Sequence, residues 1–396
     1  MNLDSSIRQL SKEIFPNLKE VREQLHTYPE LSFKEFKTSA FIKLKLKQWG
    51  IDFFDGLVDT GIVAIVHGKE DKKDIVAIRA DMDALPITEA NEVDYKSKNQ
   101  GVMHACGHDV HTTSLLGAVY ILHHTRDQWS GTVRCIFQPG EESVPGGAQQ
   151  MIKAGALGNP LPKSIIALHV EPNMDVGNFG FKKGLYMASA DEVHIDVLGD
   201  GGHAANPHLH IDTVSVAAHL LVELQQITSR LAPPTIPTVL TFGKIDGQGA
   251  TNVIPQKVTI AGTFRTFDET WRKQAHQKII DIAAGLALAY NAEIIVDIRK
   301  GYPALRNDKQ ITKIVGNKAK KWYGDENVHK ISTRLSAEDF SFFANEIPAC
   351  FYRLGVRNEE KGITYPVHHP QFDADETAVM YGAESMACFA IELLSQ

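Results

Sequence analysis

The chain has 396 residues, of which 43% are hydrophobic, 22% charged and 8% aromatic, and its formal net charge is −7. A length above the usual size of a single core predicts two domains, and the globular composition excludes a disordered or fibrous protein. No basic block or stripe occurs. We therefore expect no nucleic-acid partner and no anionic membrane surface, and small-molecule substrates fit better.

The chain shows no signal for export or membrane insertion. Its first residues, MNLDSSIRQLSKEIF, lack a basic segment followed by an apolar run, and no stretch of about 18 apolar residues occurs. We therefore expect a cytoplasmic protein. The cysteines are scattered at Cys106, Cys135, Cys350 and Cys388, and a reducing compartment would keep them as thiols.

The first half of the chain alternates helical and strand-like segments. Apolar spacing from Ser5 to about Trp49 predicts two amphipathic helices separated at Tyr28-Pro29. The strands predicted next are 62–67, 74–80, 132–138 and 164–170, with helices at 112–124 and about 147–156. Because these strands are apolar on both faces, they predict an α/β domain with a mostly parallel central sheet flanked by helices.

The order of the predicted strands and helices changes between residues 190 and 299. The predicted order is strand 192–199, helix 212–230, strand 238–245, strand 257–267, helix 268–290 and strand 292–300. This βαββαβ order is that of a ferredoxin-like α+β module. We predict that it is inserted into a catalytic domain made of residues 1–189 and 300–396, which resumes with a strand at 349–355 and closes with a helix at 376–394.

Polar side chains lie at the ends of the predicted strands. Asp81 and Asp83 follow one strand, Glu141 and Glu142 follow another, and His169 lies near the end of a third. Ligands of such sheets gather beyond the carboxyl ends of the strands. Neighbouring side chains at a strand end point in different directions, so one glutamate of the pair can bind a metal while the other faces the substrate. Simple solvation of the pair and a structural role for the histidine are the alternatives.

The segment HACGHDVH, residues 104–111, places three histidines, a thiol and a carboxylate within eight residues. These groups are the natural ligands of zinc and similar metals, and the absence of a second cysteine pair argues against a purely structural zinc site. A hydrogen-bonded loop is one alternative. Another is Cys106 as a nucleophile with His108 as its base, forming a covalent acyl-enzyme. A metal-binding scaffold without turnover is a third.

Seven segments stand in order along nearly the whole chain: RADMDALP (79–86), MHACGHD (103–109), FQPGEE (137–142), GGHAANPH (201–208), TNVIP (251–255), EDF (338–340) and HHP (368–370). Together they resemble the metallo-amidohydrolases that comprise aminoacylases, hippurate hydrolases and indole-acetyl-amino-acid hydrolases. This family belongs to the dinuclear metallopeptidase clan that includes carboxypeptidase G-type enzymes. The resemblance implies a zinc-peptidase-like catalytic domain and makes the inserted module, residues 190–299, a lid that also forms a homodimer.

The resemblance also implies roles for single residues. The metal ligands are Cys106, His108, Glu142, His169 and His368, which would hold two divalent ions drawn from zinc, manganese, cobalt and nickel. His368 is preferred to His369 because relatives read His-x-Pro there. Glu141 is the general base, and His203 is expected to reach the partner subunit's site and stabilise the tetrahedral oxyanion. Asp81, Asp83 and Asp109 are expected to orient histidines.

The implied reaction is hydrolysis of the amide bond of an N-acyl amino acid, such as an N-acetyl or N-benzoyl derivative, to a carboxylic acid and a free amino acid. Asn252 and Arg265 are expected to bind the substrate's free α-carboxylate, because a planar guanidinium suits bidentate carboxylate binding. An ordinary salt bridge of Arg265 is the alternative. A dipeptidase or aminopeptidase of the same fold is the competing function. Ser143 and Ser336-Ala337 depart from the family pattern, so the acyl group and the amino acid stay open, as does the metal.

Overall fold

A computed structural model describes residues 2–70 and 74–396, which form two compact units. Unit 1 comprises Met1–Tyr186, Arg306–Thr333 and Asp339–Gln396, and unit 2 comprises Met187–Leu305 and Arg334–Glu338. The segment 334–338 was not predicted to join unit 2. It does so through backbone pairing, because the Ala188 amide donates to the carbonyl of Arg334 at 3.1 Å.

Unit 1 is built on a mixed sheet. In spatial order, its strands in the described chain are β1 (Asp52–Leu57), β2 (Gly61–His67), β4 (Thr132–Gln138), β3 (Ile75–Asp81), β5 (Ser164–Asp175), β16 (Ala349–Arg357), β6 (Phe179–Phe181) and β15 (Val328–Lys330). The central strands β4, β3, β5 and β16 run parallel, as predicted. The pairs β1–β2, β2–β4 and β16–β6 are antiparallel. Short connections such as the one between β1 and β2 permit only antiparallel pairing.

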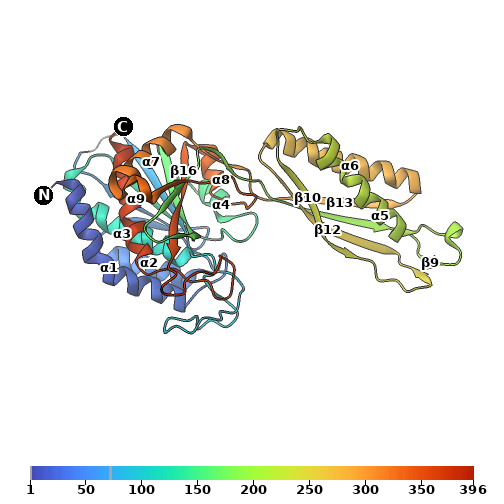
Figure 1. Cartoon of the computed structure of the whole chain (residues 1–396), viewed down its shortest axis with the longest axis horizontal. Helices are drawn as coiled ribbons and strands as arrows, with labels where there is room; N and C mark the ends of the chain where they lie inside the picture. The colour runs from blue at the N-terminus through green and yellow to red at the C-terminus, as the bar shows by residue number, and fades with distance from the viewer. Residues whose placement is uncertain (1, 71–73) are drawn as a thin grey trace. The chain divides into compact units, whose positions relative to one another are not determined.

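Helices cover both faces of this sheet. They are α1 (Leu3–Thr27), α2 (Phe36–Gln48), α3 (His108–His124), α4 (Gly147–Lys153), α7 (Lys309–Tyr323), α8 (Ser341–Glu346) and α9 (Ala378–Leu394). Figure 1 shows α3 and α9 on one side of the sheet and α4 and α8 on the other. Strands β3 and β4 are buried almost throughout, which explains their continuous apolar runs. Helices α7 and α8 were not predicted.

Helix α3 begins four residues earlier than predicted. Gly107 precedes it with φ +79°, a conformation that glycine adopts without strain, and His108 is the first helical residue. His108 and His111 therefore belong to a regular first turn, whereas the sequence predicts them just before the helix. The turn is buried, and its helical backbone fixes the directions of both side chains.

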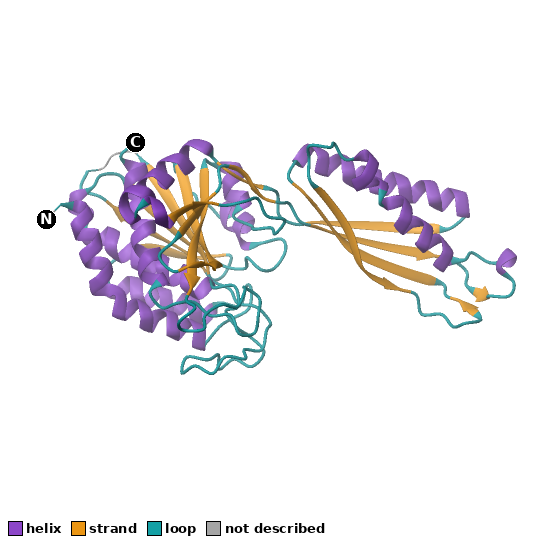
Figure 2. Cartoon of the chain, in the orientation of Figure 1, coloured by secondary structure: helices purple, strands orange, loops and turns teal. Residues whose placement is uncertain are grey.

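Unit 2 has the predicted ferredoxin-like topology (Figure 2). Its elements are β8 (Asp191–Leu198), α5 (Thr213–Leu224), β10 (Thr238–Asp246), β12 (Lys257–Thr266), α6 (Glu269–Tyr290) and β13 (Glu293–Lys300). The antiparallel strand order is β10-β12-β8-β13, and α5 and α6 pack side by side on one face of the sheet. The predicted helix 212–230 ends at Leu224 and is followed by a π-helical turn at Ile227–Leu231. A small hairpin-like pair, β9 (Gly202–His203) with β11 (Val253–Ile254), lies beyond the main sheet.

Two further short strands, β7 (Gly184–Met187) and β14 (Leu305–Asn307), pair where the chain enters and leaves unit 2.

Candidate metal centre

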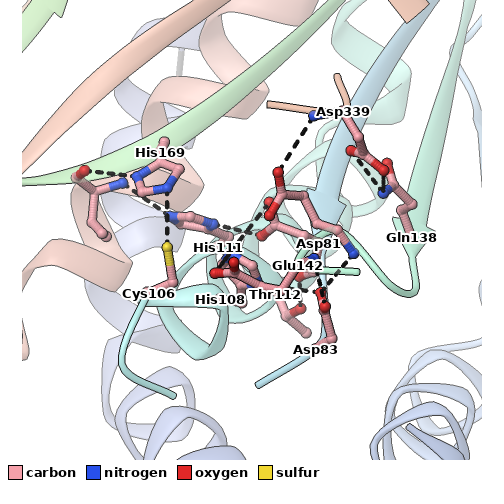
Figure 3. A network of polar contacts seen from close by, with 12 residues as sticks. Asp81, Asp83, Cys106, His108, His111, Thr112, Gln138, Glu142, His169 and Asp339 are labelled. Atoms are coloured by element: carbon pink, nitrogen blue, oxygen red, sulfur yellow. Dashed lines mark hydrogen bonds and ion pairs between the residues drawn. The ribbon is translucent and has the colours of Figure 1, made fainter. Parts of the chain in front are cut away.

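The predicted metal ligands of unit 1 lie together, and Figure 3 labels four of them, Cys106, His108, Glu142 and His169. Cys106 Sγ is 3.4 Å from His169 Nε2 and 3.3 Å from His368 Nε2. Glu142 Oε1 is 3.4 Å from His368 Nε2 and 3.9 Å from His108 Nε2. Two ligand groups result, Cys106 with His108 and His169, and Cys106 with Glu142 and His368, and in each the ligand atoms lie within 4.8 Å of one another. The structure thus brings together five residues that are up to 262 positions apart.

Hydrogen bonds orient two of these imidazoles. His169 Nδ1 lies 2.8 Å from the carbonyl oxygen of Val170, to which it donates, so the lone pair of Nε2 faces Cys106. His108 Nδ1 lies 3.3 Å from Asp83 Oδ1, so its Nε2 points toward the cluster.

The cluster contains buried polar atoms that a cation would satisfy. Among the described residues, His108 Nε2 and Glu142 Oε1 are buried without a hydrogen-bond partner. A buried polar atom left unsatisfied in this way costs roughly 1–3 kcal/mol. A cation between an imidazole lone pair and a carboxylate oxygen would satisfy both atoms, and thiolate, imidazole and carboxylate are a donor set suited to zinc and similar ions. The residues present therefore fit a metal centre.

The electrostatics agree with this fit. Burial lowers the pKa of His108, but the carboxylates of Asp81, Asp83 and Glu142 outweigh it and raise that pKa to about 10. Burial, together with Glu142 and Glu141, raises the pKa of the Cys106 thiol well above its usual value. A thiol in such surroundings does not ionise by itself. The surplus of negative charge favours a bound cation and disfavours Cys106 as a free nucleophile.

Asp83 joins the ligand helix to the glutamate pair. Its Oδ1 accepts from the Glu141 amide at 3.1 Å, and its Oδ2 accepts from the Glu142 amide at 2.9 Å. Because Oδ1 also contacts His108, one carboxylate sets the positions of a ligand histidine and of both glutamates. The predicted orienting role of Asp83 is consistent with this geometry.

Asp81 orients a histidine outside the predicted ligand set. Its Oδ1 lies 2.6 Å from His111 Nδ1, and His111 Nε2 accepts from the Val170 amide at 2.9 Å. His111 therefore links strand β3 to the backbone beside His169. Only a longer contact of 3.8 Å joins Asp81 to His108.

Asp109 contacts a histidine that is not among the predicted metal ligands. Its Oδ2 contacts Arg22 Nε and His26 Nδ1, each at 2.8 Å, and both partners belong to helix α1. Asp109 is the second residue of α3, and its side chain leaves the helix on the side of α1 instead of joining a predicted ligand. A buried ionic network extends from it, since Arg22 also binds Asp373 at 2.6 Å and His26 binds Glu89 at 3.2 Å.

A second buried network supports Glu141. The sequence did not predict this network. Arg79 donates to Asp81 at 2.6 Å and to Asp339 at 2.7 Å, and its Nε donates to Gln138 at 2.8 Å. The Asp339 amide donates to Glu141 Oε1 at 3.3 Å. An arginine inside an apolar strand must be paired, and that signal was present in the run DIVAIRAD.

The two neighbouring histidines of the HHP segment have different surroundings. His368 has φ +65° and presents Nε2 to Cys106 and Glu142. His369 stacks on Tyr365, with the ring centroids 4.4 Å apart, and accepts from the Gln371 amide. A non-glycine residue held at positive φ is typical of a functional position. His368 is therefore the one that fits the predicted ligand role.

Unit 2 carries the other predicted site residues, and it separates them. His203 and Asn252 are exposed and adjacent, since the Ala204 amide donates to the Asn252 carbonyl at 3.0 Å. Arg265 lies near the opposite end of β12 and donates to the Leu335 carbonyl at 3.0 Å. The nine residues from Lys257 to Arg265 are eight steps along the strand, which span roughly 26 Å. One unit 2 cannot place both Asn252 and Arg265 on a single carboxylate.

In the described residues, no helix has the length and apolarity needed to cross a membrane.

Comparison with known proteins identifies the family. The model of peptidase family M20/M25/M40 matches residues 77–392. The chain belongs to this family. N-acetyl-L-cysteine deacetylase of Bacillus subtilis (strain 168) is 40% identical over 91% of this chain and 84% of its own length. IAA-amino acid hydrolase ILR1-like 2 of Arabidopsis thaliana is 36% identical over 98% of this chain and 87% of its own length.

A solved structure agrees with this assignment. The YXEP protein of Bacillus subtilis, described as a dinuclear metal-binding peptidase from the M20 family, superposes with a TM-score of 0.82 at 32% identity. The match covers 97% of this chain and 99% of that one. The predicted resemblance is therefore confirmed, and the protein is a metal-binding hydrolase of amide bonds.

The different surroundings of the two histidines predict different effects of substitution. His368→Ala should lower the metal content and reduce turnover by orders of magnitude, since it removes a group that faces both Cys106 and Glu142. His369→Ala should leave the metal content unchanged. Metal analysis of the purified variants by mass spectrometry measures both. Equal metal loss in the two variants would contradict the assignment.

Proposed function

We propose that the protein hydrolyses the amide bond of N-acyl amino acids, with two divalent cations held by Cys106, His108, Glu142, His169 and His368. The observation that carries the proposal is the pair of buried, unsatisfied ligand atoms, His108 Nε2 and Glu142 Oε1, directly beside a second glutamate. The named activities of two full-length relatives support the substrate class, because both names describe amides of amino acids. The thiolate in the ligand set favours zinc, with manganese, cobalt and nickel as the other candidates.

Glu141 is the proposed general base. When bound, paired cations would lower the pKa of water toward about 7 and polarise the substrate carbonyl. With the cations in place, Glu141 would take a proton from the attacking water and return it to the departing amine. Its carboxylate is largely buried, with 7% exposure, and is held by the Asp339 amide.

A homodimer would complete the site. Unit 2 exposes apolar side chains on both helices and on an edge strand: Val214 and Val222 of α5, Ile280 and Leu288 of α6, and Ile295 of β13. Leu288 is 86% exposed. Such exposure is typical of a surface that another protein covers. In the proposed dimer, His203 acts in the partner subunit's site as a donor to the tetrahedral oxyanion, which contributes about 3–4 kcal/mol in comparable sites.

Carboxylate recognition also fits two lids better than one. Asn252 accompanies His203, whereas Arg265 lies at the far end of β12. We propose that a substrate carboxylate meets the Arg265 of one lid and the Asn252 of the other. Substrate binding would thereby require both subunits.

We propose that the protein works in the cytoplasm on small molecules, without a nucleic-acid or membrane partner.

A dipeptidase or aminopeptidase activity is the competing proposal, and the description of the YXEP protein as a peptidase favours it. The two activities differ at the nitrogen of the substrate. A peptidase of that kind recognises a free amine, whereas the N-acyl substrate has none. In both reactions, hydrolysis of the amide releases the acyl part of the substrate as a free carboxylate.

A substrate panel tests the proposal. The purified protein, loaded separately with zinc, manganese, cobalt or nickel, should hydrolyse N-acetyl, N-benzoyl or indole-acetyl amino acids faster than the matching free dipeptides. Prolonged chelation should abolish turnover and added metal should restore it. N-acyl amino-acid amides should react far more slowly than the free acids. Faster cleavage of dipeptides would establish the competing activity, and equal rates on the amides would refute carboxylate recognition.

Replacing each glutamate of the pair separates base from ligand. Glu141→Gln should keep both metals and lower kcat by roughly 10²–10⁴, because the amide preserves shape but takes no proton. Glu142→Gln should lose metal, since it removes a charged ligand atom that faces His108 and His368. Metal analysis alongside steady-state kinetics reads out both effects. The reverse pattern would exchange the two roles.

Subunit mixing tests the dimeric site. His203→Ala and Glu141→Gln subunits, each nearly inactive alone, should regain activity in mixed dimers, because one site would combine an intact Glu141 with the partner's His203. Dimers carrying two different affinity tags can be isolated before the assay. An inactive mixed dimer would place His203 in its own subunit's site or outside catalysis.

A further inference from the structure

A short segment after helix α1, residues Ser32–Glu35, packs against the turn that carries the glutamate pair. The preceding residue, Leu31, forms a β-bridge with Ala84, and Ser32 Oγ donates to Asp83 Oδ2 at 2.6 Å. Asp83 is the carboxylate that accepts from the Glu141 and Glu142 amides. The segment therefore reaches the glutamate turn through Asp83.

A second contact is direct. Glu35 Oε1 accepts from the Gly140 amide at 2.9 Å and from the Phe33 amide at 2.8 Å. Its other oxygen, Oε2, accepts from the Thr60 hydroxyl at 2.9 Å. Gly140 immediately precedes Glu141, so Glu35 holds the backbone one residue from the proposed base.

Phe33 is strained at this point. Its φ is +62°, an unusual conformation for a bulky residue. Its ring covers Gly140 so closely that a Cβ at Gly140 would lie 2.4 Å from the ring. Gly140 itself has φ +65°. Strained residues of this kind persist chiefly at functional sites, where the surrounding structure enforces them.

Burial of the Glu35 carboxyl group also costs free energy. Its side chain is fully buried, and burial together with the neighbouring Asp83 carboxylate raises its pKa to about 7. A buried carboxyl of this kind is weak evidence for stability, because desolvation offsets much of what its hydrogen bonds contribute. A role in placing the glutamate turn accounts for both the strained Phe33 and the buried Glu35.

We propose that Ser32, Phe33 and Glu35 form a clamp that positions the Gly140–Glu142 turn for proton transfer by Glu141. They are positioning residues, because each acts through Asp83 or Gly140 and not on the substrate. The clamp rests on the proposed function, since it presumes that Glu141 is the base. Misplacement of a reacting group by about 1 Å can cost about 100-fold in rate, so the clamp controls kcat without holding metal.

The test compares three variants in the metal-loaded enzyme. Glu35→Ala removes the acceptor of the Gly140 amide and should lower kcat at least about tenfold, with KM within about twofold and an unchanged metal content. Glu35→Gln keeps an acceptor oxygen and can donate to Thr60, so it should retain kcat within about threefold. Thr60→Val is the matched control, because it removes the partner of Glu35 Oε2 and leaves the Gly140 contact in place.

Three outcomes would overturn the clamp. A folded Glu35→Ala protein with wild-type kcat would show that the contact has no positioning role. An equal loss of kcat in Glu35→Ala and Thr60→Val would indicate general stabilisation only. Loss of metal in Glu35→Ala would show that the segment holds the ligand Glu142 and not the base.

A milder variant covers the case in which Glu35→Ala does not fold. Ser32→Ala removes only one donor to Asp83 and should lower kcat about threefold or more at unchanged metal content, whereas wild-type kcat in that variant would overturn the clamp. Wild-type hydrolysis of the best panel substrate is measured in parallel. An inactive wild type refutes the proposed function, whereas an active wild type with active Glu35→Ala refutes the clamp alone.

Discussion

The carboxylate of Asp83 is the interaction on which the site depends. It is fully buried, yet burial does not leave it protonated, because bonds from His108, Ser32 and the Glu142 amide lower its pKa. Each of its oxygens accepts more than one hydrogen bond, and its partners come from three separate stretches of the chain. A carboxylate with several donors is rigid, since any rotation would break more than one charge-assisted bond. The first turn of α3 and the glutamate turn after β4 are therefore held in one frame.

Buried arginine and histidine side chains neutralise aspartates on two sides of this frame, and each side forms a layer of paired charges. Arg79 neutralises Asp81 and Asp339 on one side, and Arg22 with His26 neutralises Asp109 on the other. Burial lowers the pKa of His26, but the carboxylates of Asp109 and Glu89 raise it to about 9, so it stays charged in this network. Between the layers lie Cys106, His108 and Glu142, and the carboxylates of Asp81, Asp83, Glu141 and Glu142 concentrate negative charge around them. A bound cation would balance that charge.

The two units carry different kinds of surface. Unit 1 contains the whole candidate metal centre, and unit 2 carries exposed polar groups, His203 and Asn252, beside exposed apolar surface. In the proposed dimer, the apolar surface would serve association and the polar groups would serve the partner subunit's site. A single association would then cover the apolar surface and bring the polar groups to the partner subunit, which gives a physical reason for an inserted domain.

Much of this arrangement was determined by the sequence itself. Periodicity placed β2, β3, β4 and the ferredoxin-like order of unit 2, because the pattern of buried positions differs between strands and helices. The strand-end positions of Asp81, Asp83 and Glu141 followed from the same pattern, and the motifs identified the family. Tertiary structure decided which partners those groups meet. That Asp109 faces α1, that Arg79 reaches Asp339 across 260 positions, and that Arg265 lies a strand's length from Asn252 depend on where distant segments pack. Local sequence carries the direction of each backbone element, whereas the partner of a buried charge is set by whichever segment folding brings beside it.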